Sequence, residues 1–108
     1  MARFAIFFRF RPETIKAMMD RPSDRAAAVS KLCESAGARM DAYYLMFGEW
    51  DGMVIVEGSD SKTAAAVSLA VSSSGALAQL STHELLDSGE FVEALGRASG
   101  LTYSPPGA

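Results

Sequence analysis

A chain of 108 residues with a formal net charge of −3 is long enough for one domain with a modest core. Its acidic pI of about 5.0 argues against the basic surface that non-specific nucleic-acid binding needs. No apolar run reaches the roughly 18 residues of a membrane-spanning helix. The single cysteine, Cys33, excludes an internal disulfide and fits a reducing compartment. We therefore expect a cytoplasmic protein with no nucleic-acid or membrane partner.

An apolar strand and a short helix are predicted at the N-terminus. Residues Phe4–Phe10 alternate as a strand, with the even-numbered side chains on one face and the odd-numbered ones on the other. Pro12 suits the first turn of a short helix over Glu13–Met19. Pro22 ends this helix, because the residue before a proline is pushed out of the helical region.

A second helix is predicted from a cap at Ser23 or Asp24 to about Ala36. Its apolar stripe includes Cys33, which we expect to be a small buried residue rather than a reactive thiol. Gly37 stands where a helix is commonly closed by a residue in the left-handed conformation.

The stretch Met40–Gly58 consists of two apolar runs around a short turn, Gly48-Glu49-Trp50-Asp51. Short apolar runs bounded by glycine and aspartate indicate strands, so Asp41–Phe47 and Gly52–Glu57 are predicted to form a hairpin. Both runs are apolar at nearly every position, whereas a half-exposed strand would alternate. We therefore expect both faces of this hairpin to be covered, one by the chain's own helices and the other by a second subunit.

A helix, a last strand and a C-terminal helix complete the predicted elements. The turn Ser59-Asp60-Ser61 caps an alanine-rich helix over Thr63–Ser72. Ala76–Leu86 is a strand that is more polar than the others, which suits a sheet edge. Asp87 followed by Glu90 resembles a capping box, which predicts a final helix that ends near residue 100.

This order of elements, β-α-β-β-α-β with a further helix, predicts an α+β protein with the ferredoxin-like fold. Two split βαβ units with right-handed crossovers give a sandwich of helices on an antiparallel four-stranded sheet of order 4-1-3-2. We expect residues 1–100 to form a single domain and residues 101–108 a flexible C-terminal tail. The sheet face without helices would be bare in a monomer, so we predict a dimeric α+β barrel, formed by a homodimer or a dimer-based oligomer.

The block Tyr43–Ser81 resembles the GYD-domain family, small bacterial proteins named for a Gly-x-Tyr-Asp turn after an aromatic strand. The resemblance lies in the turn Gly48-Glu49-Trp50-Asp51, the apolar strand and alanine-rich helix after it, and Gly75 before the last strand. Trp50 stands where the family has tyrosine, and Ala76 where it usually has asparagine. The resemblance implies the dimeric α+β barrel group, which includes cofactor-free monooxygenases, lactone isomerases, haem proteins and amino-acid-sensing modules. It also implies a domain of uncharacterised function.

The hairpin turn carries the first candidate site residues. Antiparallel pairing would bring Asp51 close to Arg9 or Arg11, so Arg9, Trp50 and Asp51 could form a ligand rim. The alternative is a structural turn in which Asp51 accepts backbone N–H groups and pairs with an arginine. Tyr43, Tyr44, Trp50 and the phenylalanines could form an aromatic ligand pocket, but the same side chains also suit a packed dimer core.

His83 is the only histidine of the chain and the natural general base near neutral pH. If its face of the last strand points into a barrel, Gln79, Ser81 and His83 line a cavity; if that face points outward, His83 is a solvated edge residue. His83 could also be an axial haem ligand. There is no nucleophile motif, phosphate-binding loop or metal-ligand spacing, so we expect no metal site and no cofactor.

Three functional hypotheses follow. The leading one is a non-catalytic homo-oligomeric module with a modest apolar cavity for a small organic ligand. The competing one is a cofactor-free monooxygenase- or isomerase-like enzyme on a small aromatic substrate, with catalytic His83 carrying protons and Arg9 or Trp50 positioning the substrate. It predicts an enclosed cavity larger than about 300 Å³ that His83 lines. The weakest is haem binding through His83.

Overall fold

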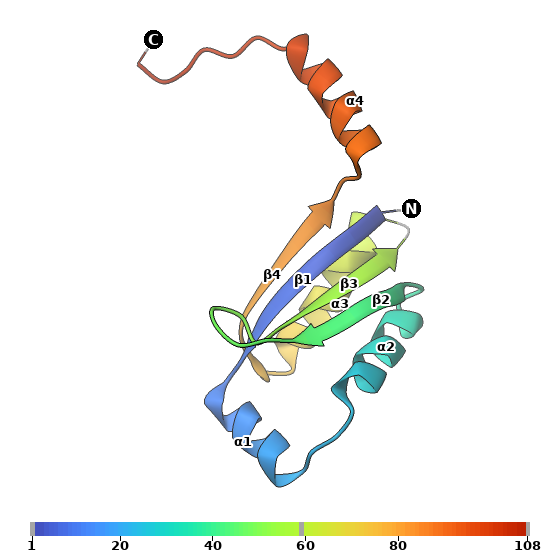
Figure 1. The fold of residues 1–108 in the computed structure, drawn as a ribbon, viewed down its shortest axis with the longest axis vertical. Coiled ribbons are helices and arrows are strands. Elements are labelled where there is room, and N and C mark those ends of the chain that lie inside the picture. The colour runs from blue at the N-terminus through green and yellow to red at the C-terminus, as the bar shows by residue number, and fades with distance from the viewer. Residues whose placement is uncertain (1, 59, 108) are drawn as a thin grey trace.

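The computed structural model describes residues 2–58 and 60–107 (Figure 1), so Ser59 of the predicted turn and Ala108 of the tail lie outside the described residues. The elements in chain order are β1 (Ala2–Phe10), α1 (Pro12–Asp20), α2 (Arg25–Ser35), β2 (Arg39–Leu45), β3 (Gly52–Gly58), α3 (Ser61–Ser73), β4 (Leu77–Leu85) and α4 (Ser88–Ser99). The strands form one antiparallel sheet of order β2-β3-β1-β4. This is the predicted order 4-1-3-2 read from the other edge, which confirms the α+β ferredoxin-like fold.

The helices α2, α3 and α4 begin at side-chain caps that the sequence predicts. The carboxylate of Asp24 accepts a hydrogen bond from the backbone N–H of Ala27 at 3.2 Å, and Asp60 caps α3 in the same way. At α4 the cap is reciprocal. Asp87 accepts from the N–H of Glu90 at 2.8 Å, and Glu90 accepts from the N–H of Asp87 at 3.0 Å. The predicted capping box is therefore confirmed.

The second strand differs from its prediction by two residues. The structure places β2 at Arg39–Leu45 rather than Asp41–Phe47. A register shift between Met40 and Ala42 interrupts its pairing with β3, and residues 46–51 form the hairpin loop. Phe47 is fully exposed in this loop, so its aromatic character is not evidence of a strand position.

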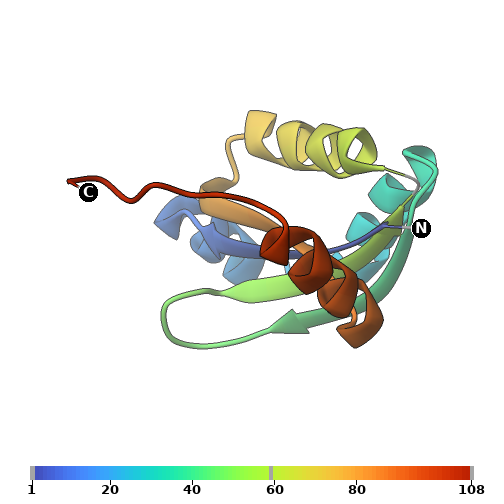
Figure 2. The ribbon, with the colours of Figure 1, turned by 90° about the horizontal axis from the view of Figure 1, so that it is seen from above.

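The helices α2 and α3 cover one face of the sheet. α2 packs against β2, and α3 packs against β4 and β3 (Figure 2). The even-numbered residues of β1 point toward these helices, and Ile6 keeps only 3% of its surface exposed. It forms the core cluster with Val54, Val56 and Cys33. Cys33 is completely buried, as predicted for a small core residue.

The opposite side of the sheet has none of the described helices packed over it. We call it the uncovered face; it carries Ala5 and Phe7 of β1, Met53 and Ile55 of β3, and His83 of β4. Ala5 is buried, whereas Phe7, Met53 and Ile55 are half-buried. The strand alternation thus puts apolar side chains on both faces, and the chain covers one of them.

The C-terminal helix α4 lies beyond the end of β4, away from both layers (Figure 1). Its apolar side chains Phe91, Val92 and Leu95 are 55%, 63% and 54% exposed. The molecule is therefore drawn out, with a radius of gyration of 17.2 Å where a compact domain of this length has about 13 Å. In the described part of the chain, no helix combines the length and apolar character needed to cross a membrane.

Candidate functional site

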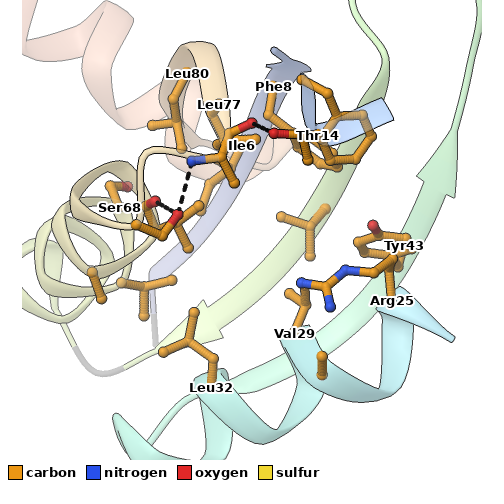
Figure 3. Close-up of a pocket in the computed structure, with 18 of the residues that line it drawn as sticks. Ile6, Phe8, Thr14, Arg25, Val29, Leu32, Tyr43, Ser68, Leu77 and Leu80 are labelled. Atoms are coloured by element: carbon orange, nitrogen blue, oxygen red, sulfur yellow. Dashed lines mark hydrogen bonds between the residues drawn. The ribbon is translucent and has the colours of Figure 1, made fainter. Parts of the chain in front are cut away.

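An apolar groove of about 510 Å³ opens on the helix side of the sheet, between α2 and α3 (Figure 3). Its floor includes Ile6 and Phe8 of β1. One wall carries Val29 and Leu32 of α2, and the other carries Ser68 of α3. We call this space the interhelical groove.

The interhelical groove exists because α3 presents only small side chains to it. These residues of α3 are Val67, Ser68, Ala70 and Val71. α2 packs at the β2 side of the sheet and α3 at the β4 side, so short side chains cannot fill the space over the central strands. An apolar concavity of this size with a few polar groups is the usual form of a small-molecule site.

The polar groups at the α1 end of the groove form hydrogen bonds with one another. The hydroxyl of Thr14 donates to the carbonyl of Ala76 at 2.7 Å, and the N–H of Arg11 donates to the same oxygen at 3.1 Å. The N–H of Ala76 donates to the hydroxyl of Ser74 at 3.2 Å. These bonds tie α1 to the start of β4, so this end of the groove is a structural joint.

The α2 side of the groove carries its main polar groups. Arg25, the first residue of α2, lies beside Tyr43 of β2 (Figure 3). Burial raises the pKa of the Tyr43 hydroxyl above its ordinary value of 10.0; the Arg25 guanidinium opposes this effect and the Asp24 carboxylate reinforces it. Tyr43 is therefore a neutral hydrogen-bond donor at physiological pH.

Cys33, on the α2 side of the groove, is a buried thiol. Burial raises its pKa above the ordinary value of 9.0, and the charge of Glu34 acts in the same direction. Because the thiolate is the nucleophilic form, a raised pKa makes this cysteine unreactive. In residues 2–58 and 60–107, no group of three or more His, Cys, Asp or Glu side chains is placed to hold a metal ion.

An aromatic cluster on the uncovered face contains two of the predicted site residues, Trp50 and His83. The ring of Phe7 lies between them, with centroid distances of 5.9 Å to Trp50 and 5.8 Å, edge-on, to His83. The hydroxyl of Ser81 lies 2.7 Å from Nε2 of His83, within hydrogen-bond distance. Phe7 is the residue that brings Trp50 and His83 together, and the sequence analysis had not singled it out among the phenylalanines of its aromatic pocket.

The predicted site residues do not form one site, because they lie on both faces of the sheet and in the hairpin loop. Arg9 and Gln79 are cross-strand partners on β1 and β4, on the same face as His83. Tyr43 lies on the opposite side, in the interhelical groove. Because His83 does not line this groove, the groove is not the cavity that the enzyme hypothesis requires.

Asp51 anchors the hairpin loop to the end of β1. Its carboxylate accepts a hydrogen bond from the N–H of Phe10 at 2.8 Å. Its own N–H donates to the carbonyl of Phe8 at 2.9 Å. The expected ion pair with Arg9 or Arg11 is not among the ion pairs of the described residues. This geometry agrees with the structural interpretation of the turn, in which Asp51 binds backbone N–H groups.

Four charged side chains form an ion-pair network at the other end of the uncovered face. Arg3 lies 3.0 Å from Glu57 and 3.6 Å from Asp41; Arg39 lies 2.8 Å from Asp41 and 3.3 Å from Glu57. The hydrogen bond to Asp41, with the charges of Asp41 and Glu57, raises the pKa of Arg39. Strand pairing brings Arg3 and Arg39 opposite Glu57, which the sequence analysis did not foresee because it did not assign strand register.

The sequence analysis predicted a modest apolar cavity but did not place it between α2 and α3, because the residues there have the composition of an ordinary core. The available signal was the mismatch in side-chain size between the helix over residues 61–73, which is rich in alanine and serine, and the phenylalanine-rich first strand. Small residues facing large ones leave space unless the helix moves closer to the sheet.

The sequence model of the GYD domain matches residues 4–95 of this chain, from within β1 to within α4. The chain belongs to the GYD-domain family. The predicted resemblance is therefore confirmed. No curated protein matches this GYD domain.

Among solved structures, this GYD domain is similar to a chain described as "crystal structure of FFRP-DM1". The TM-score is 0.50 at 15% sequence identity, and the match covers 80% of the GYD domain's chain and 100% of the other. At this identity the likeness shows a shared fold alone. One fold supports many unrelated functions, so no function follows from it.

Proposed function

We propose that this GYD domain is a non-catalytic homo-oligomeric module that binds a small organic ligand in the interhelical groove. The uncovered face is the observation that supports homo-oligomer formation. It exposes 64% of Tyr44 and leaves Phe7, Met53 and Ile55 half-buried. Domains are built from packed layers, so an apolar sheet face needs a second layer. Two such faces packed together give an isologous dimer.

The helix α4 supports association with a second copy. A helix of 12 residues is marginal in water unless its apolar side packs against a surface. Phe91, Val92 and Leu95 remain more than half exposed in the single chain. A second copy would supply a surface for these side chains as well as for the uncovered face.

The interhelical groove supports ligand binding. Its volume of about 510 Å³ falls in the range of small-molecule sites, roughly 300 to 1,000 Å³. Its lining is mostly apolar, and the Arg25–Tyr43 pair is among its polar groups. The groove lies on the helix side of the sheet, so pairing of the uncovered faces leaves it open.

The assembly part is tested by light scattering and native mass spectrometry of the wild-type chain, which we expect to be a dimer or a dimer-based oligomer at micromolar concentration. Phe7→Asp should give a monomer, because pairing would bury an unpaired carboxylate. Tyr44→Asp, at a more exposed position, tests the same face with less risk to folding. Leu69→Asp is the matched control, since Leu69 is 70% exposed on α3. A monomeric wild type, or equal dissociation by the control, contradicts the assembly.

The Ser81–His83 contact favours an enzyme as the second candidate function. A hydroxyl lies 2.7 Å from an imidazole nitrogen that belongs to the ring beside Phe7, on a face that dimerisation would enclose. In this candidate His83 carries protons, and Arg9 or Trp50 positions a small aromatic substrate. Oxygen uptake with a dihydroxynaphthalene should then depend on His83 and disappear in His83→Ala. Absence of uptake by the wild type removes this monooxygenase candidate.

A further inference from the structure

We infer that the ligand of the interhelical groove is a small amphiphilic organic anion, with a carboxylate head at Arg25 and Tyr43 and a hydrocarbon body over β1 and β3. This inference rests on the proposed ligand-binding function of the groove and adds the chemical class of the ligand.

The charge of the groove lining is the first observation. The chain carries 13 acidic and 10 basic residues, so it is acidic as a whole. The described lining residues reverse this balance, since they include Arg21 and Arg25 and no carboxylate. A concave site lined by one sign of charge attracts ligands of the opposite sign, and low-dielectric walls strengthen the effect.

The availability of Arg25 is the second observation. In the described part of the chain, all ion pairs are made by Arg3 and Arg39, so Arg25 has no carboxylate partner there. The neighbouring Asp24 caps α2, with Oδ1 at 3.2 Å from the N–H of Ala27. Asp24 does not lie within ion-pair distance of Arg25, although it is adjacent in sequence. The guanidinium of Arg25 is therefore free to bind an anion.

The hydrogen-bond donors of Arg25 and Tyr43 specify the head group of the ligand. A guanidinium presents a planar fork of N–H donors that matches the two oxygens of a carboxylate. Tyr43 adds an O–H donor beside it, and this hydroxyl makes no hydrogen bond within the described residues (Figure 3). The raised pKa of Tyr43 keeps this donor protonated at neutral pH. Head groups without oxygen acceptors would leave these donors unpaired.

The floor of the groove specifies the body. Ile6, Val54 and Val56 of the sheet face Val29 and Leu32 of α2, and none of these side chains has a polar atom. A polar body would lose its hydrogen bonds to water there without replacement. The body is therefore a hydrocarbon, and its burial supplies the affinity that the head group orients.

The test compares decanoate with decanamide, its neutral counterpart, by isothermal titration calorimetry on the full chain at neutral pH and below micellar concentrations. We expect decanoate to bind at least about tenfold more tightly, the usual effect of one or two hydrogen bonds to a charged group. Arg25→Gln should remove this difference, because it should weaken decanoate binding far more than decanamide binding. Arg3→Gln, on the uncovered face, should leave both probes unchanged.

Two further variants place the probes in the groove. Val29→Trp should fill the space and abolish binding of both probes, whereas Leu69→Trp, on an exposed part of α3, should not. Circular dichroism shows whether each variant is folded. Equal affinity for the two probes, or an Arg25→Gln variant that retains the preference for decanoate, overturns the anion assignment while ligand binding stands. If neither probe binds the wild type, or if folded Val29→Trp binds both normally, the proposed ligand function fails together with this inference.

Discussion

The two faces of the sheet differ in cover although the same strands build both. Phe7 and Phe8 are neighbours in β1 and are the same residue type. Phe8 is 7% exposed under the helices, whereas Phe7 is half-buried on the uncovered face beside Trp50 and His83. Apolar side chains therefore show that a face is suited to burial, but the topology of the helices decides which face the chain itself buries.

The two faces also differ in how far their apolar character extends. The helix side is apolar along the central strands and contains the interhelical groove. The uncovered face has an aromatic cluster toward the hairpin end and the network of Arg3, Arg39, Asp41 and Glu57 at the other end. Its apolar part is therefore bounded, which suits a surface that pairs in one register with a second copy.

The largest expected difference between the faces is in the cost of removing a phenylalanine. Phe8→Ala should lower the free energy of unfolding by about 3–5 kcal/mol at any protein concentration, because it leaves a cavity in the core. Phe7→Ala should cost less at low concentration, and its cost should grow with concentration because it weakens association. Urea unfolding at two protein concentrations measures both. Equal costs that do not depend on concentration would show that the uncovered face has no partner.

A smaller difference is expected between two glycines, one in the sheet and one in α4. A Cβ on Gly52 would clash with the ring of Phe8, so Gly52→Ala should lower the free energy of unfolding by about 1–3 kcal/mol. A Cβ on Gly96 would meet nothing within 4 Å, so Gly96→Ala should favour the helix by up to about 1 kcal/mol. Thermal unfolding of both variants checks this. Destabilisation by Gly96→Ala would show that α4 packs tightly against another surface at this residue.

The smallest expected effect is on the free energy of unfolding at alkaline pH, through two groups on the helix side of the sheet. Burial raises the pKa of Cys33 above 9.0 and that of Tyr43 above 10.0. The unfolded chain therefore loses these protons at lower pH than the folded chain, and the free energy of unfolding should fall as pH rises above about 9. Cys33→Ala and Tyr43→Phe should each make this fall less steep in urea titrations between pH 8 and 11. An unchanged slope in both variants would contradict the assignment.

The sequence alone determined the fold and most element boundaries, because these depend on local chemistry. Asp24 and Asp87 cap helices where a short acceptor precedes a helical pattern. Gly37 follows α2 with φ of +76°, a conformation that glycine adopts at little cost. Cys33 is buried because it lies on the apolar stripe of α2. Each of these features is set by residues within a few positions along the chain.

Only the tertiary structure decided where the candidate sites lie. It placed Tyr43 in the groove and His83 on the opposite face, and it put Phe7 between Trp50 and His83. These outcomes depend on strand register and on the volume that remains when small side chains of α3 face large ones of β1. Both are properties of pairs of segments far apart in the chain, so no local pattern specifies them.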